Sequence, residues 1–213
     1  VKILSSLGNE YANTVYEHNM PSSVKKPTVD SEYPERETFI RTKYESKAFL
    51  RPESAEKGFN AELIEGIETD NVHRVYALIA NGAQINHCDQ KSGGIGPLHR
   101  AVVKGNLVMV DFLAQNNAKL DIVDEQGWTP LHYAAYHDHS PVAMLLFKRG
   151  ANPKILDKKG QTPLAVATVN QRADCVTLLR LALLVLQERK DDNDESFREA
   201  LDSFARDGLK LEI

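Results

Sequence analysis

The side chains best suited to metal binding or acid–base chemistry are histidines and cysteines in the middle and C-terminal parts of the chain. Nitrogen and sulfur ligands suit zinc, and His87, Cys88, His137, His139 and Cys175 offer them. These five residues are spread along the chain without two closely spaced pairs of the kind that hold zinc. We therefore predict no metal site among them.

A catalytic centre is also not expected. The sequence shows no recognisable combination of nucleophile, base and orienting residue, and no pair of carboxylates in an apolar context. The run Gly93-Gly94-Ile95-Gly96 is rich in glycine, as phosphate-binding loops are, but no lysine follows it. We predict that the chain is not an enzyme and carries no catalytic or cofactor-binding residue.

Two further histidines belong to a repeated pattern. The runs Gly96-Pro97-Leu98-His99, Thr129-Pro130-Leu131-His132 and Thr162-Pro163-Leu164-Ala165 place their prolines 33 residues apart, which is the period of ankyrin repeats. Such repeats bury their apolar faces only by stacking on their neighbours. The pattern predicts an all-α ankyrin solenoid of about four repeats, in which His99 and His132 hydrogen-bond the backbone of the preceding cap and turn.

The third repeat shows the pattern most clearly. Thr129 is expected to cap the first helix, Pro130 to occupy its first position, and Gly150 to end the second helix. The second repeat carries two extra residues within 90–94, which predicts a longer turn. The first repeat has Glu62-Leu63 in place of Pro-Leu, as expected of a divergent end repeat. The apolar residues expected inside the third repeat are Leu131, Ala134, Ala135, Val142, Leu145 and Leu146.

Aromatic side chains gather in the turn and first helix of the third repeat. Trp128, Tyr133, Tyr136 and His137 occupy positions that face solvent or the concave groove, where aromatic residues make good interaction anchors. Lys158 lies at the tip of the next turn. We predict that these five residues bind a partner protein. The alternative is that some of the aromatic rings only pack against adjacent repeats.

Helical segments flank the repeats. Two N-terminal segments, 2–17 and 35–50, each place apolar residues on one helical face, with a proline-containing loop between them. After the repeats, one helix is expected to continue to Arg189 and a last one to begin near Glu195, both closing the solenoid. The apolar faces comprise Leu4, Leu7, Tyr11 and Val15 in the first segment, Phe39, Ile40, Tyr44 and Ala48 in the second, and Phe197, Leu201 and Phe204 in the last.

Composition excludes several classes of partner. Basic and acidic residues balance up to residue 182, so the net charge of −4 lies in residues 183–213, and no basic stripe suits a nucleic acid. The longest apolar run, Leu181–Leu186, is too short to cross a membrane. Two cysteines and no secretory leader favour a reducing, intracellular setting. The first methionine is Met20, so we expect the chain to be a fragment.

The N-terminal part carries five short runs in a fixed order. They are Leu7–Asn13, Tyr16-Glu17, Lys25–Pro27, Phe39–Tyr44 and Phe49-Leu50. Together they resemble the C-terminal half of an ArfGAP domain. An ArfGAP domain followed by ankyrin repeats is a standard pairing in that family.

The C-terminal part resembles one branch of the same family. Cys175–Ala182, Asp194–Phe197 and Phe204 are similar to the ArfGAP proteins with coiled-coil, ankyrin-repeat and PH domains, also called centaurin-beta. The predicted domains are the C-terminal part of an ArfGAP domain at 1–58, ankyrin repeats at 59–182, and capping helices with an acidic tail at 183–213. The predicted repeats are 59–88, 89–123, 124–156 and 157–182.

The resemblance implies a protein that activates GTP hydrolysis by Arf-type small GTPases in membrane trafficking. Such a protein is cytoplasmic and peripheral to endosomal or plasma membranes, which it contacts through upstream domains. The family's four-cysteine zinc finger and catalytic arginine lie upstream of this chain, and neither Arg36, Arg41 nor Arg51 carries the arginine's motif. The chain alone is therefore expected to be inactive and to hold no cofactor, zinc belonging to the full-length domain.

Two expectations complete the prediction. The N-terminal helices are expected to form the scaffold behind the finger, with the divergent first repeat docked on them. The ankyrin repeats are expected to bind protein ligands. The alternative function is an ankyrin interaction module with no connection to a GTPase, in which the N-terminal helices are only a cap.

Overall fold

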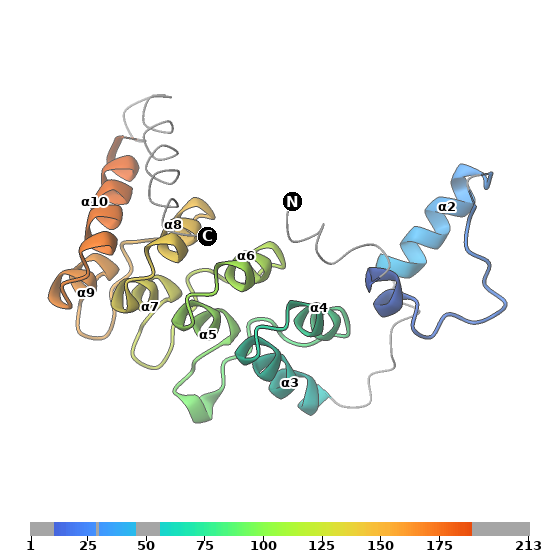
Figure 1. Cartoon of the computed structure of the whole chain (residues 1–213), viewed down its shortest axis with the longest axis horizontal. Helices are drawn as coiled ribbons and strands as arrows, with labels where there is room; N and C mark the ends of the chain where they lie inside the picture. Colours follow the sequence, from blue (N-terminus) through green and yellow to red (C-terminus); the bar gives the residue numbers. More distant parts are fainter. Residues whose placement is uncertain (1–10, 29, 46–55, 189–213) are drawn as a thin grey trace. The chain divides into compact units, whose positions relative to one another are not determined.

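The computed structural model describes residues 11–28, 30–45 and 56–188, which fall into two compact units, 1–84 and 85–213 (Figure 1). Within these residues the secondary structure is helical, apart from one isolated antiparallel bridge between Asp89 and Ile95. The predicted all-α ankyrin fold is confirmed.

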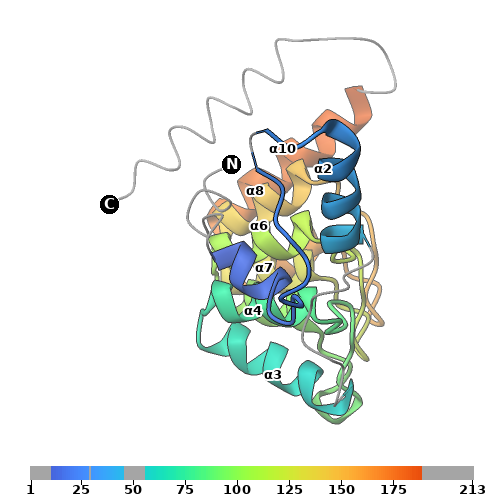
Figure 2. The ribbon, with the colours of Figure 1, turned by 90° about the vertical axis from the view of Figure 1, so that its right-hand side faces the viewer.

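The second unit contains three helix pairs in sequence order. The first helices contact one another in the order α5, α7, α9, and the second helices in the order α6, α8, α10. Figure 1 shows these pairs in order, and in Figure 2, turned by 90°, α6, α8 and α10 overlap. The pairs are α5 (Pro97–Val103) with α6 (Leu107–Gln115), α7 (Pro130–His137) with α8 (Ser140–Lys148), and α9 (Pro163–Val169) with α10 (Ala173–Glu188).

Local sequence signals set where these helices begin and end. The Thr129 hydroxyl accepts a hydrogen bond from the His132 backbone N–H, and Pro130 is the first residue of α7, as predicted. Gly150, just after α8, has φ +102°, a conformation that favours glycine. The expected core is also confirmed, since Leu131, Ala134, Ala135, Val142 and Leu146 are buried, whereas Leu145 is only half-buried.

Two buried aspartates shape the turns between repeats. One carboxylate oxygen of Asp124 accepts the backbone N–H groups of Gln126 and Trp128, each at 2.8 Å. Asp157 accepts those of Lys159 and Gln161 in the same way. Burial alone would raise the pKa of Asp157, but these hydrogen bonds outweigh it and the pKa is lowered. Both carboxylates therefore act as acceptors that close the turn.

His99 and His132 join each repeat to the next. Nδ1 of each ring accepts a backbone N–H three residues earlier, from Gly96 and Thr129 respectively, as predicted. The Nε2 atom of each ring reaches the following turn, a contact that the sequence did not predict. His99 Nε2 lies 3.1 Å from both Ile122 O and Trp128 O, and His132 Nε2 lies 3.1 Å from Gln161 O. Because Nδ1 accepts, the neutral ring carries its proton on Nε2.

The turn tips are also joined by backbone hydrogen bonds. The Glu125 N–H donates to Gly93 O at 2.9 Å, and the Lys158 N–H donates to Gln126 O at 3.0 Å. The second turn, predicted to be longer, contains a short 3-10 helix, Gln90–Ser92, which the sequence did not predict. The tips therefore form a continuous, closely spaced edge along the repeats.

The first unit contains the helices of the divergent first repeat. α3 (Glu56–Glu68) and α4 (Val72–Ala80) pack together through Leu63, Ile67 and Val75, which are fully buried. The Asn71 side chain caps α4 by accepting the Arg74 N–H. This is the helix pair of an ankyrin repeat without the Pro-Leu signal.

The N-terminal part of this unit is helical at residues 11–16 and again from Tyr33. Here α2 (Tyr33–Ile40) continues into a π-helical turn, Arg41–Glu45. Of the residues predicted on its apolar face, α2 contains Phe39, which is half-buried, and Ile40, which is 54% exposed, and none of the residues of α2 is buried. The shared face itself stays a prediction. Leu4, Leu7 and Ala48 lie outside the described residues.

The C-terminal helix α10 continues through Leu186 to Glu188, as predicted. Arg189 and the expected last helix, with Phe197, Leu201 and Phe204, lie outside the described residues. In the part of the chain that the structure describes, no helix combines the length and apolarity needed to cross a membrane. The domain boundaries drawn from the sequence stay a prediction.

Gly127 and Gly160 occupy the same turn position in successive repeats and give a matched pair of tests. Both have positive φ, +80° and +73°. A Cβ on Gly127 would lie 3.0 Å from Lys158 N, whereas one on Gly160 would meet nothing within 4 Å. We expect Gly160→Ala to cost about 1 kcal/mol and Gly127→Ala at least about 1 kcal/mol more, because the adjacent turn must move. Urea unfolding of both variants measures the difference, and equal costs would contradict a close contact between turns.

His132→Ala tests the link between repeats, and Ala165 shows that alanine is tolerated at this position in the fourth repeat. Burial lowers the pKa of His132 below its ordinary value, despite opposing contributions from Gln161 and two aspartates. As pH falls, His132 therefore becomes protonated in the unfolded state before it does in the folded state. The free energy of unfolding decreases as pH falls below about 6.5. At pH 7.5 we expect the variant to have a free energy of unfolding about 2 kcal/mol below that of the wild type. Between pH 7.5 and 5.5, the free energy of unfolding should fall less in the variant than in the wild type. An unchanged pH dependence in urea unfolding would show that His132 does not contribute to it.

Candidate partner-binding surface

The aromatic residues singled out in the third repeat form one cluster. The Trp128 ring centroid lies 5.1 Å from that of Tyr133 and 5.4 Å from that of Tyr136. Tyr136 and His137 meet edge to face at 5.0 Å. The structure thus brings four of the five predicted binding residues together on α7 and the turn before it.

Two members of the cluster also hold the fold together. The Trp128 Nε1–H donates to Asp157 at 3.0 Å, and the Tyr133 hydroxyl donates to Asp124 at 2.7 Å. Burial and the Asp124 carboxylate both raise the pKa of Tyr133, so its hydroxyl stays protonated as a donor. Both side chains are half-buried, and they contribute packing as well as surface.

The other two members face solvent. Tyr136 is 39% exposed, and His137 is exposed as well. His137 stacks on His139 at 5.7 Å, and His139 Nε2 lies 3.1 Å from Val103 O. Burial lowers the pKa of His137, and the nearby His139 and Arg172 lower it further, so the ring is neutral at pH 7. These two rings are the accessible part of the cluster.

Lys158 lies apart from the aromatic contacts. Its backbone N–H joins it to Gln126 at the turn tip, and its side chain is exposed. Within the described ranges, no group of three or more His, Cys, Asp or Glu residues is arranged to hold a metal ion.

A row of exposed apolar residues passes through the cluster, and the sequence prediction missed it. Val103, Tyr136 and Val169 lie in the last turns of α5, α7 and α9 and are 36%, 39% and 67% exposed. We call these three residues the last-turn row. They are spaced at the ankyrin period, so aligning the repeats for exposed apolar positions would have found them.

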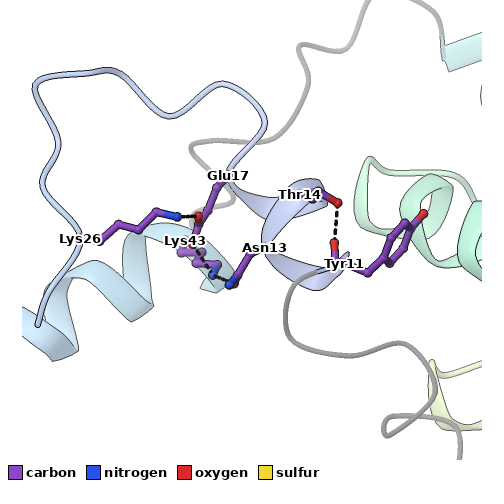
Figure 3. A network of polar contacts seen from close by, with 6 residues as sticks. All are labelled: Tyr11, Asn13, Thr14, Glu17, Lys26 and Lys43. Carbon is purple, nitrogen blue, oxygen red and sulfur yellow. Dashed lines mark hydrogen bonds and ion pairs between the residues drawn. The ribbon is translucent and has the colours of Figure 1, made fainter. Parts of the chain in front are cut away.

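A second feature is the polar network of the N-terminal segment (Figure 3). Lys43 is 5% exposed, and its Nζ donates to Asn13 Oδ1 at 2.5 Å and to Glu17 Oε1 at 2.7 Å. Glu17 also pairs with Lys26. Burial alone would raise the pKa of Glu17, but the nearby Lys26 and Lys43 have the larger effect and the pKa is lowered. The network joins the helical residues 11–16 to the π-helical turn.

Every member of this network belongs to a run that carries the ArfGAP resemblance. Asn13 ends the first run, Glu17 lies in the second, Lys26 in the third and Lys43 in the fourth. Four runs that are separate in the sequence are therefore linked in the structure by one polar network.

Tyr11, from the first of these runs, contacts the first repeat. Its hydroxyl donates to His73 O at 2.8 Å, and its ring meets that of His73 at 4.7 Å. Tyr16 meets Tyr76 at 6.2 Å. The expected docking of the first repeat on the N-terminal helices is confirmed for residues 11–16 and α4.

Comparisons with known proteins identify ankyrin repeats in the chain and several relatives. Residues 63–157 match the family model "Ankyrin repeats (3 copies)". The chain is 27% identical to ARF GTPase-activating protein GIT2 of Mus musculus over 143 residues, covering 61% of this chain and 20% of that protein. It is 44% identical to ADP-ribosylation factor GTPase-activating protein AGD12 of Arabidopsis thaliana over 45 residues, covering 21% of this chain and 13% of that protein.

A third relative is Protein csx2 of Schizosaccharomyces pombe, 28% identical over 122 residues, covering 57% of this chain and 13% of that protein. The chain spans about a fifth of the length of the GIT2 proteins it matches. It thus contains ankyrin repeats and is similar to ArfGAP-type proteins over somewhat more than half of its length.

Glu17→Gln tests the buried network, because it leaves the Lys43 ammonium with one fewer anionic partner. Removing one partner of a buried ion pair costs about 3 kcal/mol, so amide hydrogen exchange in residues 11–45 should quicken about 100-fold. Glu37→Gln is the control, since its pair with Arg41 is exposed and its loss should cost under about 0.5 kcal/mol. Equal exchange in the two variants would show that the network does not hold the segment.

Proposed function

We propose that this chain is part of a GTPase-activating protein for Arf-type small GTPases. In it, residues 1–58 supply the C-terminal part of the GAP domain and the ankyrin repeats bind protein partners. The observation that carries the proposal is the convergence of Asn13, Glu17 and Lys43, because these residues come from separate runs that resemble the ArfGAP domain. The names of GIT2 and AGD12 as ARF GTPase-activating proteins support it.

The finer assignment is to the branch with coiled-coil, ankyrin-repeat and PH domains. The similarity of Cys175–Ala182 and the acidic tail to that branch supports it. The protein would then act in the cytoplasm at endosomal or plasma membranes, and its upstream domains would make the membrane contact. The ankyrin repeats would hold a partner protein near the GTPase.

The cysteines of this chain do not fit the zinc finger of the family. Burial, with contributions from two aspartates, raises the pKa of Cys175 to about 12, and its Sγ lies 3.5 Å from Ala134 O. Burial also raises the pKa of Cys88. Zinc binds the thiolate, and these two thiols stay protonated inside ankyrin repeats. Zinc would have to be bound by cysteines outside this chain.

In activation, this chain would therefore hold the helices of the GAP domain in position and would not supply a catalytic group. An arginine that meets the charge developing on the transferring phosphoryl group accelerates hydrolysis by about 10³–10⁵, and we assign no arginine of this chain to that role. Arg41 is engaged with Glu37 on the surface of the protein. The buried network would hold the helices behind the finger in position.

The test compares two proteins, this chain alone and the chain extended by the sequence encoded upstream of Val1. We expect the chain alone to change Arf GTP hydrolysis by less than about twofold and the extended protein to accelerate it by at least about 10³. Single-turnover release of phosphate from GTP-loaded Arf measures both. The extended sequence should also contain a Cys-x-x-Cys pair.

Two outcomes would contradict the proposal. Strong stimulation by this chain alone would show that the catalytic groups lie within it. An extended protein with no Cys-x-x-Cys pair and no stimulation would favour the alternative, an ankyrin interaction module unrelated to a GTPase.

A further inference from the structure

Three of the described helices end on an asparagine whose side chain folds back onto its own helix. The Nδ2 group donates to the carbonyl oxygen four residues earlier, at 2.7 Å for Asn81 on α4 and at 2.8 Å for Asn116 on α6 and Asn170 on α9. That carbonyl also accepts the backbone N–H of the same asparagine. Each side chain therefore closes the last turn of its helix with a second hydrogen bond.

Asn81 differs from the other two because glycine follows it. Asn-Gly occurs once in the sequence, at residues 81–82, whereas the other two asparagines precede larger residues, Asn117 and Gln171. An asparagine side chain loses ammonia when the next backbone nitrogen attacks its Cγ. Glycine, which has no Cβ, allows that nitrogen the closest approach. Asn81 therefore carries the most reactive amide of the three.

The reaction needs only water as a co-reactant. The Gly82 nitrogen forms a bond to Asn81 Cγ, the Cγ–Nδ2 bond breaks, and the amide group leaves as ammonia with the proton of the Gly82 N–H. Water then adds to either carbonyl carbon of the cyclic imide and opens the ring. The products are aspartate and isoaspartate, and both carry a carboxylate in place of the carboxamide.

The folded helix end holds these atoms away from reaction. The Gly82 N–H donates to Ile79 O at 3.1 Å, and Asn81 Nδ2 is held by Ala77 O. The ψ angle of Asn81 is 9°, which turns the Gly82 nitrogen away from the asparagine side chain. Cyclisation therefore requires the last turn of α4 to open.

Docking of the N-terminal segment opposes this opening. The Tyr11 hydroxyl donates to His73 O at 2.8 Å, and the Tyr16 ring meets that of Tyr76 at 6.2 Å. Both contacts are made to α4, which has nine residues. A helix of this length has little stability of its own, so contacts along it keep its last turn closed. Residues 11–16 therefore protect the amide.

The carboxylate product does not fit the closed turn. The oxygen that replaces Nδ2 would face Ala77 O, and both atoms are acceptors. The other oxygen, Asn81 Oδ1, is buried and has no hydrogen-bond partner, so a negative charge there lacks a donor. The helix dipole also opposes an anion at the C-terminal end of a helix. Conversion of the amide thus favours the open state of α4.

We propose that Asn81 is a site of spontaneous deamidation, gated by the docking of residues 11–16 on α4. The reaction makes a reversible opening of the first repeat lasting, because the carboxylate prevents the turn from closing as before. The site is a one-way switch that releases the N-terminal segment from α4. This inference goes beyond the proposed function and does not depend on a GTPase.

Peptide mapping of the full chain by mass spectrometry tests the proposal. After incubation in mildly alkaline buffer, with or without urea, the conversion of amide to carboxylate is followed at Asn81, Asn116 and Asn170. In urea, which unfolds the chain, we expect Asn81 to react at least about tenfold faster than the other two, because glycine follows it. Without urea, Asn81 should react at least about 30-fold more slowly than in urea, because the turn is seldom open.

Tyr11→Phe tests the gating, since it removes the hydrogen bond to His73 O and keeps the ring. Without urea, this variant should deamidate at Asn81 about fivefold faster than the wild type, and in urea the two should react equally. Tyr33→Phe is the matched control. Tyr33 is 76% exposed on α2, and its variant should react as the wild type does.

Asn81→Asp reproduces one product, and Asn81→Ala removes the amide without adding a charge. Amide hydrogen exchange in α4 should quicken about 30-fold in Asn81→Asp and less in Asn81→Ala. The difference between the two variants measures the effect of the carboxylate itself.

Several outcomes would overturn the proposal. They are equal rates at the three asparagines in urea, a rate at Asn81 that folding does not slow, equal effects of the two tyrosine substitutions, and no conversion of Asn81 without urea even in Tyr11→Phe. Equal hydrogen exchange in Asn81→Asp and Asn81→Ala would overturn the one-way switch. Arf GTP hydrolysis enters none of these measurements, so the proposed function is tested separately.

Discussion

The ankyrin repeats of this protein depend on hydrogen bonds that leave one repeat and end in the turn of the next. His99 and His132 each accept a backbone N–H at the start of their own helix and use the other ring nitrogen to reach the following turn. A ring can do both only while it is neutral, with one nitrogen accepting and the other donating. These histidines therefore help to align successive turns, together with the backbone hydrogen bonds between the turn tips.

Hydrogen bonds to two turn aspartates hold some rings of the aromatic cluster in the fold and leave the others on the surface. Asp124 and Asp157 close their turns with one carboxylate oxygen and bind Tyr133 and Trp128 with the other. These two rings are therefore oriented before any ligand arrives, whereas Tyr136 remains exposed beside them. Of the two interpretations drawn from the sequence, packing describes Trp128 and Tyr133, whereas partner binding stays a prediction for the exposed Tyr136 and His137.

Much of the repeat architecture could be predicted because its signals are local. A threonine cap, a proline at the first helical position and a glycine with positive φ act within a few residues, so the period alone located them. Contacts between distant segments could not be predicted in this way. The second hydrogen bond of His132 spans 29 residues and the bond from Lys43 to Asn13 spans 30.

A buried ion pair holds the N-terminal segment, whereas polar contacts of several kinds join the repeats. The N-terminal segment is held by a buried charge, which tolerates little change because the loss of one partner leaves the other ion without compensation. The network therefore links residues 13–17 to the π-helical turn through one buried ammonium group. The repeats are joined by neutral hydrogen bonds, such as that between His132 and Gln161 O, and also by charged groups, since Trp128 donates to the Asp157 carboxylate and Arg149 pairs with Asp111. The exposed side chains of Val103 and Val169 take no part in these polar contacts, so the joining of the repeats does not dictate which residue stands at either position.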